Sequence, residues 1–280
     1  MTSSPAALLT LYCLAIAAFS LLGGLLPGWV RMTHTRTQLI MSLVSGLMLG
    51  VAFYHLLPHS VILLGDPAAI DTAVWWLVAG LIAMFLLLRL FHFHQHDFSH
   101  EEGEHHDHDH AHGHAAHELS WVGIALGLGL HTLIDGVALG AVMRSAGAGA
   151  GLAGAGVFLA ILLHKPLDAM SIVTIMEQGG WSRSARVAAN IGFALMCPLG
   201  ALLFFFGVDV FAGGSEYAVA ASLAFAAGAF ICIALSDLLP EVHFHSHDRV
   251  KLTLAFLLGI AIAWLMGGLE PASLHGAHVP

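Results

Sequence analysis

Residues 187–208 read VAANIGFALMCPLGALLFFFGV and contain no Asp, Glu, Lys or Arg. An uncharged apolar run of about 20 residues spans the hydrocarbon core of a bilayer when it forms an α-helix. In lipid the helix is favoured because it satisfies its own backbone hydrogen bonds. This stretch therefore predicts a transmembrane helix and places the chain among the all-α membrane proteins.

The composition of the whole chain agrees with lipid as the solvent. Of its 280 residues, 58% are hydrophobic and 10% are charged, and the mean hydropathy is +0.84. Soluble domains carry about a quarter charged residues. The 9 Lys and Arg residues are scattered along the chain, which excludes a nucleic-acid-binding surface. We expect the lipid bilayer, and no nucleic acid, among the partners.

Further apolar runs accompany residues 187–208, and together they predict a polytopic bundle of eight transmembrane helices in a single domain, residues 1–280. No Lys or Arg precedes the first run, so it is interpreted as a retained helix and not as a cleaved signal. The predicted helices cover residues 6–27, 39–64, 72–91, 120–143, 150–176, 187–208, 217–239 and 251–269.

Basic residues in the connecting loops predict how the bundle is oriented. Seven of them fall in one set of alternate loops, and Arg144 alone falls in the other set. Because cytoplasmic loops carry the excess of Lys and Arg, both termini are predicted to face outward. We expect an integral multi-pass protein of a bacterial inner (plasma) membrane. The seven residues are Arg31, Arg36, Arg89, Arg183, Arg186, Arg249 and Lys251.

The segment between the third and fourth predicted helices, residues 92–118, is rich in histidine. It holds 11 of the 21 His residues and seven of the 18 acids. Its low complexity and lack of hydrophobic periodicity predict a disordered loop, and the orientation makes this loop cytoplasmic. We expect it to buffer or sense metal ions, with a plain polar linker as the alternative.

Two predicted helices carry a His and an Asp at membrane depth. The fourth contains His-Thr-Leu-Ile-Asp-Gly at residues 131–136, and the fifth contains His-Lys-Pro-Leu-Asp at residues 164–168. Residues four apart share one helix face, and ionisable groups inside a span are costly and usually functional. Imidazole and carboxylate both bind zinc, which favours four ligands in a tetrahedron. The predicted metal ligands are His131, Asp135, His164 and Asp168.

A proline lies beside the second pair. Pro166 removes a backbone donor and clashes with the preceding turn, so we expect kinked metal-binding helices four and five around a freed carbonyl. Broken helices around a midplane site are typical of transporters. For either pair alone, an interhelical hydrogen-bond clamp is the alternative reading, but two matched pairs in consecutive helices favour a metal site.

The second and seventh predicted helices end in a shared polar-Leu-Leu-Pro-polar pattern. It reads His-Leu-Leu-Pro-His at residues 55–59 and Asp-Leu-Leu-Pro-Glu at residues 237–241. We interpret the polar residues as stations where the ion enters or leaves the bundle, and polar helix caps are the alternative. These residues are His55, His59, Asp237 and Glu241.

At these residues the sequence resembles the ZIP family of zinc- and iron-regulated transporters. The family's span-four signature, His-Asn-x-x-(Glu/Asp)-Gly, is similar to residues 131–136, and its span-five signature is similar to residues 164–168. The resemblance covers essentially the whole chain. It implies one transporter domain, no enzymatic activity, and no cofactor, since the metal is the transported substrate. It also implies that a divalent metal enters the cytoplasm between spans four and five, through a site that is binuclear in many members.

Three residues depart from the family pattern, all at positions of its second metal site. Thr132 stands in place of Asn, Lys165 in place of an acid, and Cys197 in place of the Glu that often precedes Pro-Leu-Gly. A charged ammonium donates hydrogen bonds and cannot ligate a metal. We therefore predict a mononuclear site in which Lys165 takes the place of the second ion.

Zinc is the predicted substrate, with iron, manganese and cadmium as further candidates. The alternatives left open are a metal exporter, a membrane metal sensor without transport, and a membrane enzyme. The sequence lacks the His-Glu-x-x-His motif of a metalloprotease. A homodimer is a further expectation.

Overall fold

The computed structural model describes residues 4–25, 34–65, 68–92, 114–146, 153–213, 215–238 and 249–268. The regular structure of these residues is helical, and no strand occurs among them. Eight of the described helices are long and apolar enough to cross a membrane. The predicted fold class, an all-α polytopic bundle, is therefore confirmed.

The helices begin and end within a few residues of most of the predicted bounds. The π-helical segments η2 and η5 continue the helices before them, and η2 is followed by α3 within the second span. The elements are α1 (Pro5–Leu25), α2 (His34–Val51), η2 (Ala52–Leu56), α3 (Leu57–Leu64), α4 (Ala69–His92), α5 (His114–Ser145), α6 (Ala155–Gln178), α7 (Arg183–Ala212), α8 (Glu216–Ile233), η5 (Ala234–Leu238) and α10 (Arg249–Gly267).

The start of α5 differs from the prediction. This helix begins at His114 and not near residue 120, so residues 114–118 of the predicted disordered loop are helical. His92, the first residue of that predicted loop, ends α4. Residues 93–113, the remainder of the histidine-rich segment, lie outside the described residues.

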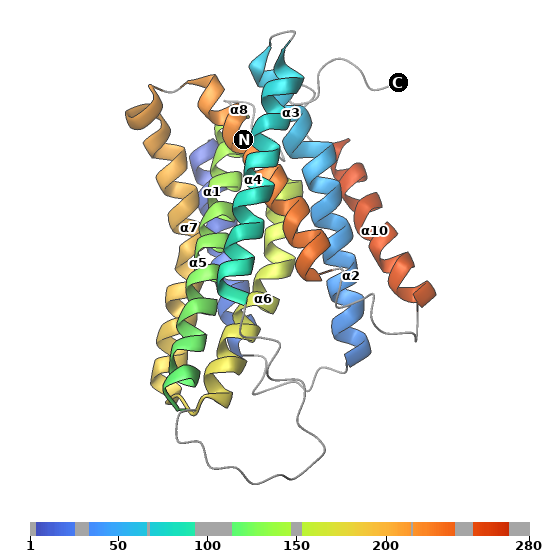
Figure 1. Ribbon diagram of the computed structural model, residues 1–280. Helices are drawn as coiled ribbons and strands as arrows, with labels where there is room; N and C mark the ends of the chain where they lie inside the picture. The colour runs from blue at the N-terminus through green and yellow to red at the C-terminus, as the bar shows by residue number, and fades with distance from the viewer. Residues whose placement is uncertain are drawn as a thin grey trace.

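The helices form two closely packed groups that share one apolar core (Figure 1). In the first group, α1 packs against α6 and α7, and α5 packs against α7. In the second group, α2 packs against α10, and α4 packs against α8. The contacts of α5 with α8 and α4 join the groups. The fourth and fifth spans, α5 and α6, which carry the predicted ligands, therefore belong to the same group.

The crossing of α5 and α7 depends on glycine. A Cβ at Gly136 of α5 would overlap the Cys197 carbonyl oxygen, and a Cβ at Gly200 of α7 would overlap the Leu133 carbonyl oxygen. Small residues at such a crossing let two backbones approach closely in a membrane. The approach lies directly beside Asp135, so it fixes how far α7 stands from the predicted metal ligands.

Irregular backbone precedes a proline of the second span, and the kink predicted at Pro166 stays a prediction. Helix α6 runs through Pro166 without interruption, whereas η2 precedes Pro58 in the second span. In η2 the Leu57 N–H donates to the Ala52 carbonyl, five residues back. A proline clashes with the carbonyl four residues before it, and the wider π turn relieves this crowding.

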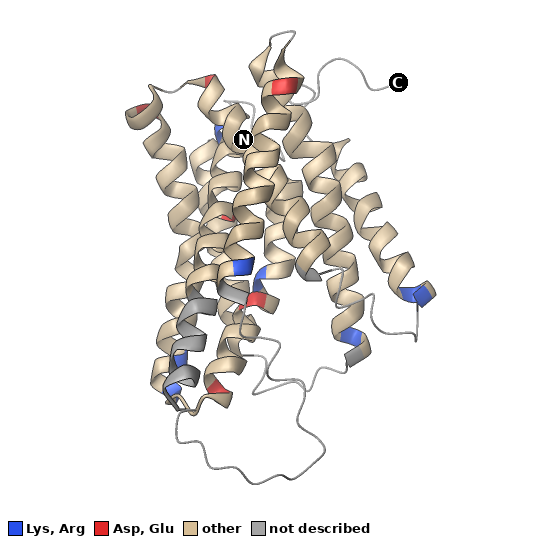
Figure 2. Ribbon diagram, in the orientation of Figure 1, with Lys and Arg blue, Asp and Glu red and all other residues tan. Residues whose placement is uncertain are grey.

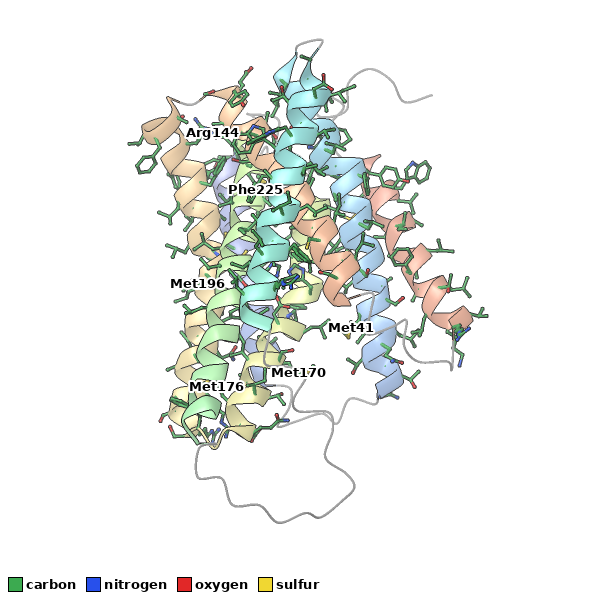
Figure 3. The ribbon with its side chains drawn as sticks, viewed as in Figure 1. Met41, Arg144, Met170, Met176, Met196 and Phe225 are labelled. Atoms are coloured by element: carbon green, nitrogen blue, oxygen red, sulfur yellow. The ribbon has the colours of Figure 1, made fainter. Side chains whose placement is uncertain are left out.

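Charged side chains are distributed unequally between the two ends of the bundle (Figure 2). The end formed by the starts of α7 and α10 collects most of the blue residues, and Arg144 lies at the opposite end, where Figure 3 labels it. There Arg144 of α5 forms an ion pair with Asp209 of α7. Six of the seven basic residues used in the orientation argument belong to described helices, and Arg31 lies outside the described residues.

Candidate metal centre

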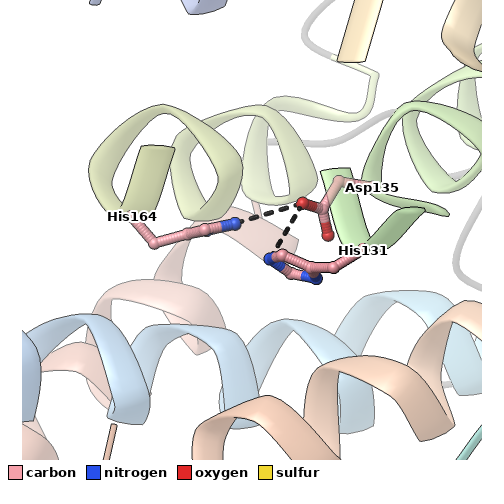
Figure 4. Close-up of side chains that lie close together, drawn as sticks. All are labelled: His131, Asp135 and His164. Carbon is pink, nitrogen blue, oxygen red and sulfur yellow. Dashed lines mark hydrogen bonds and ion pairs between the residues drawn. The ribbon is translucent and has the colours of Figure 1, made fainter. Parts of the chain in front are cut away.

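Helices α5 and α6 bring the predicted pair His131 and Asp135 together with His164 of the second pair (Figure 4). The His164 Nε2 atom lies 3.2 Å from Asp135 Oδ2, and the His131 Nε2 atom lies 3.4 Å from the same oxygen. His131 and Asp135 face each other because they are one helical turn apart on α5. One carboxylate oxygen is thus shared by imidazoles from two helices.

The three groups are buried and close enough to hold one ion. The residues His131, Asp135 and His164 are 2%, 0% and 1% exposed. One ligand atom from each lies within 4.8 Å of the other two. Two imidazoles and a carboxylate form a donor set that suits zinc. The spacing that predicted these ligands in the sequence therefore brings three of the four into one cluster.

Asp168, the fourth predicted ligand, lies at the edge of this cluster. Its Oδ2 atom is 3.5 Å from His131 Nε2 and 3.9 Å from His164 Nε2. Its side chain is 12% exposed, more than that of any of the other three. Asp168 is therefore the ligand with the most access to the surroundings of the site.

The hydrogen bond that orients His164 favours a cation at the centre. The Ala160 carbonyl oxygen is an acceptor only, so the His164 Nδ1–H donates to it across 2.7 Å. In the neutral ring the lone pair of Nε2 then points at the Asp135 carboxylate. A neutral His164 facing this carboxylate is stabilised by a positive charge beside the contact, whereas a protonated His164 would donate to the carboxylate itself. A second ring nitrogen bonded to a backbone carbonyl is also the usual arrangement of a metal-binding His.

Lys165 supplies a positive charge at this point. Its Nζ atom lies 2.5 Å from Asp135 Oδ2 and 3.0 Å from Asp168 Oδ2. The ammonium also donates to Thr132 Oγ1 across 3.0 Å, and its Nζ atom lies 3.4 Å from His131 Nε2. The Thr132 hydroxyl can accept this bond because it donates its own hydrogen to the Leu128 carbonyl. Two of the three residues that depart from the family pattern thus form one hydrogen-bonded unit with the predicted ligands.

Helix α7 lies against this unit. Cys197, the third departing residue, is 1% exposed. Phe193 lies one turn earlier on α7, and its ring centroid is 5.6 Å from Lys165 Nζ. Sequence reasoning missed Phe193, although its i, i+4 spacing from Cys197 places both on one face of α7.

The four predicted stations are not part of the described cluster. His55 lies in η2, where its Nε2 atom is 2.7 Å from the Ala263 carbonyl oxygen of α10. Its ring also contacts Gly156 of α6, where an added Cβ would lie 2.9 Å from His55 Cε1. His59 is buried in α3. The Asp237 side chain and Glu241 lie outside what the structure describes.

Comparison with known proteins adds an independent observation. The family model described as ZIP Zinc transporter matches residues 89–267. Zinc transporter ZIP9-B of Xenopus laevis is 33% identical over 136 residues, which are 46% of this chain and 44% of that protein. Zinc transporter ZIP9 of Micropogonias undulatus is 33% identical over 133 residues, 46% of this chain and 42% of that protein. Zinc transporter foi of Drosophila melanogaster is 32% identical over 142 residues, which are 51% of this chain and 19% of that protein. The match thus covers somewhat less than half the length of the two ZIP9 proteins and about a fifth of the length of foi.

Proposed function

Because this chain belongs to the ZIP zinc transporter family, we propose that it carries a divalent cation, zinc first of all, across the membrane that its eight helices span. The observation that carries the proposal is the buried Asp135 Oδ2 atom, which imidazoles from α5 and α6 both approach. Such a group of ionisable side chains inside a membrane bundle is costly unless it serves an ion. Iron(II), manganese and cadmium are further candidate substrates.

The proposed route runs between α5 and α6 and delivers the ion to the cytoplasm. His131, Asp135, His164 and Asp168 would ligate the ion at the middle of this route. The end of the bundle that collects Lys and Arg would face the cytoplasm (Figure 2). The histidine-rich segment would then lie on the receiving side and buffer ions that have just arrived.

The proposed stations at the ends of the route are His59, Asp237 and Glu241. We assign a different role to His55, because its hydrogen bond to the Ala263 carbonyl joins η2 to α10. A side chain used in this way holds two helices together and has its ring nitrogen engaged with the backbone.

The proposed site holds one ion, with Lys165 in place of a second. Two carboxylates and one ammonium leave the site with a net charge of about −1, and one divalent ion changes this to about +1. A second divalent ion would concentrate more positive charge in a medium that tolerates little of it. Anomalous scattering from a zinc-soaked crystal is expected to show one ion here, and two fully occupied positions would contradict the mononuclear site.

Uptake of radioactive zinc into proteoliposomes tests the transport proposal. Loss of a residue that only hydrogen-bonds a metal ligand typically costs roughly 10- to 100-fold in metal affinity or activity. Because Asp168 is itself a proposed ligand, we expect Asp168→Ala to reduce uptake by at least this factor. Asp71→Ala is the matched control, because Asp71 is an exposed acid in the first turn of α4. It should transport like the wild type.

Each other result favours a specific alternative. A folded wild-type protein that binds zinc without moving it would be a sensor. Zinc movement only out of the cytoplasmic side would indicate an exporter. Equal loss of uptake in the Asp71 and Asp168 variants would contradict the proposed site.

A further inference from the structure

We propose that Lys165 is a tethered competitor of the transported ion. Its ammonium has to leave the carboxylate oxygens of Asp135 and Asp168 before a divalent cation can bind them, and the ring of Phe193 receives it. This inference rests on the proposed function. It names the pair of residues that sets how tightly the ion is held and how quickly it is released.

The first step of the argument is that the two cations need the same atoms. Lys165 Nζ contacts Asp135 Oδ2, Asp168 Oδ2 and His131 Nε2 at 2.5, 3.0 and 3.4 Å. These oxygens and this nitrogen are also the atoms that would ligate zinc. A neutral imidazole nitrogen has one lone pair, so His131 Nε2 can accept from the ammonium or bind a metal, but it cannot do both.

The second step is that the ammonium cannot withdraw into water. Lys165 is 1% exposed, and its neighbours on α5 and α7 are buried as well. Any new position must therefore stabilise the charge within the protein. Burying an ammonium without a partner is too costly for a displaced lysine to remain unpaired.

The third step is that such a position exists beside the site. The Phe193 ring centroid is 5.6 Å from Nζ, within the range of about 6 Å over which an aromatic face attracts a cation. Thr132 Oγ1, 3.0 Å from Nζ, is an acceptor that the metal site does not use. An ammonium that releases the acids can therefore keep its bond to Thr132 and approach the ring.

The consequence is a moderate affinity that a transporter can use. A competitor fixed to the neighbouring helical turn acts at a high effective concentration. It opposes binding and replaces the ion as the ion departs, so neither carboxylate is left without a cation. Conduction requires binding strong enough for capture and weak enough for release.

A double-mutant cycle on equilibrium zinc binding tests the inference. The full chain in lipid nanodiscs is titrated with Zn²⁺ as the wild type, Lys165→Met, Phe193→Leu and the double variant. Removing charge-assisted hydrogen bonds that oppose the ion should tighten binding about tenfold or more in Lys165→Met. Phe193→Leu should weaken binding about threefold, because the displaced ammonium loses its aromatic partner. In the Lys165→Met background, Phe193→Leu should have no effect.

Two outcomes of the double-mutant cycle would contradict the inference. Binding by Lys165→Met that is no tighter than wild type would contradict it, as would an equal effect of Phe193→Leu in both backgrounds. Lys165→Gln replaces the Met variant if that protein does not elute as a folded species in size-exclusion chromatography. A zinc-loaded structure provides a direct check, since Nζ should lie beyond hydrogen-bond distance of both Oδ2 atoms.

The same set of proteins separates the two proposals. If the wild type and Lys165→Met bind zinc with equal affinity and both transport it, only the proposal that Lys165 competes with the ion is wrong. If neither folded protein binds zinc, both the competition and the proposed function are wrong. If the competition is correct, Lys165→Met should also turn over more slowly than wild type at saturating zinc, because the ion leaves a site without a replacement cation.

Discussion

Asp135 Oδ2 is approached by three groups, the imidazoles of His131 and His164 and the ammonium of Lys165. The second oxygen of this carboxylate, Oδ1, is buried and has no hydrogen-bond partner among the described residues. Buried polar atoms are rarely left in this state without a functional reason. At the scale of single residues, the site therefore has unused capacity at Asp135, which a bound cation would engage.

His55 provides a prediction about stability. Its ring nitrogen bonds the Ala263 carbonyl, so His55→Ala should lower the free energy of unfolding by about 1–3 kcal/mol, the cost of an unsatisfied buried group. Zinc affinity should be unchanged, because His55 is outside the ligand cluster. The measurement is thermal unfolding in detergent, together with zinc titration.

His55→Gln is the matched control for that change. A glutamine amide can donate to the same carbonyl, so this variant should recover much of the lost stability. If His55→Ala kept the wild-type stability but lost zinc uptake, the residue would be a station on the ion route and not a link between η2 and α10.

The i, i+4 spacing predicted which His and Asp share a helix face, because each pair lies within a single helix, and three of these four residues form one cluster in the structure. The partner of His55 could not be predicted in this way, since the Ala263 carbonyl is 208 residues away in the chain. Lys165 was predicted to take the place of a second ion beside the two acids, and its Nζ atom does lie 2.5 Å from Asp135 Oδ2 and 3.0 Å from Asp168 Oδ2.

At the scale of helices, hydropathy predicted the spans well because each has to match the thickness of the bilayer. The π segments η2 and η5 were not predicted. A π turn is only one residue wider than an α turn, so it leaves no periodic signal in a sequence. The shared Leu-Leu-Pro pattern did point to both positions. The proline of this pattern accounts for the irregular backbone before Pro58. It gives no direct support to a metal station.

The crossing of α5 and α7 gives a prediction for one helix with an internal control. Gly200→Ala places a methyl group against the Leu133 carbonyl and should cost about 1–3 kcal/mol of stability by overpacking. It should also weaken zinc binding, because α5 is pushed away together with His131 and Asp135. Unfolding and zinc titration of the purified variant measure both effects.

Gly192→Ala is the matched change on the same helix. Nothing lies within 4 Å of a Cβ at Gly192, and alanine favours a helix over glycine by roughly 0.5–1 kcal/mol. This variant should be as stable as the wild type or slightly more stable. Similar losses in both variants would show that α7 is sensitive to any substitution and that the crossing has no special role.

At the scale of the whole molecule, the bundle has one end that collects cations and another where the described basic residue, Arg144, is paired with Asp209 (Figure 2). Arg186, at the basic end, is also ion-paired, with Glu177. The count of basic residues at each end therefore carries the argument. It supports an orientation in which the starts of α7 and α10 face the cytoplasm.

Cysteine labelling tests this orientation, because the chain's three cysteines are all buried and give a low background. Glu216→Cys and Ser184→Cys place exposed thiols at the start of α8 and in the first turn of α7, at opposite ends of the bundle. A membrane-impermeant maleimide added to intact cells should label Glu216→Cys and should reach Ser184→Cys only after permeabilisation. The reverse pattern would place the basic end outside. That result would contradict the predicted orientation, in which the histidine-rich segment lies on the cytoplasmic side.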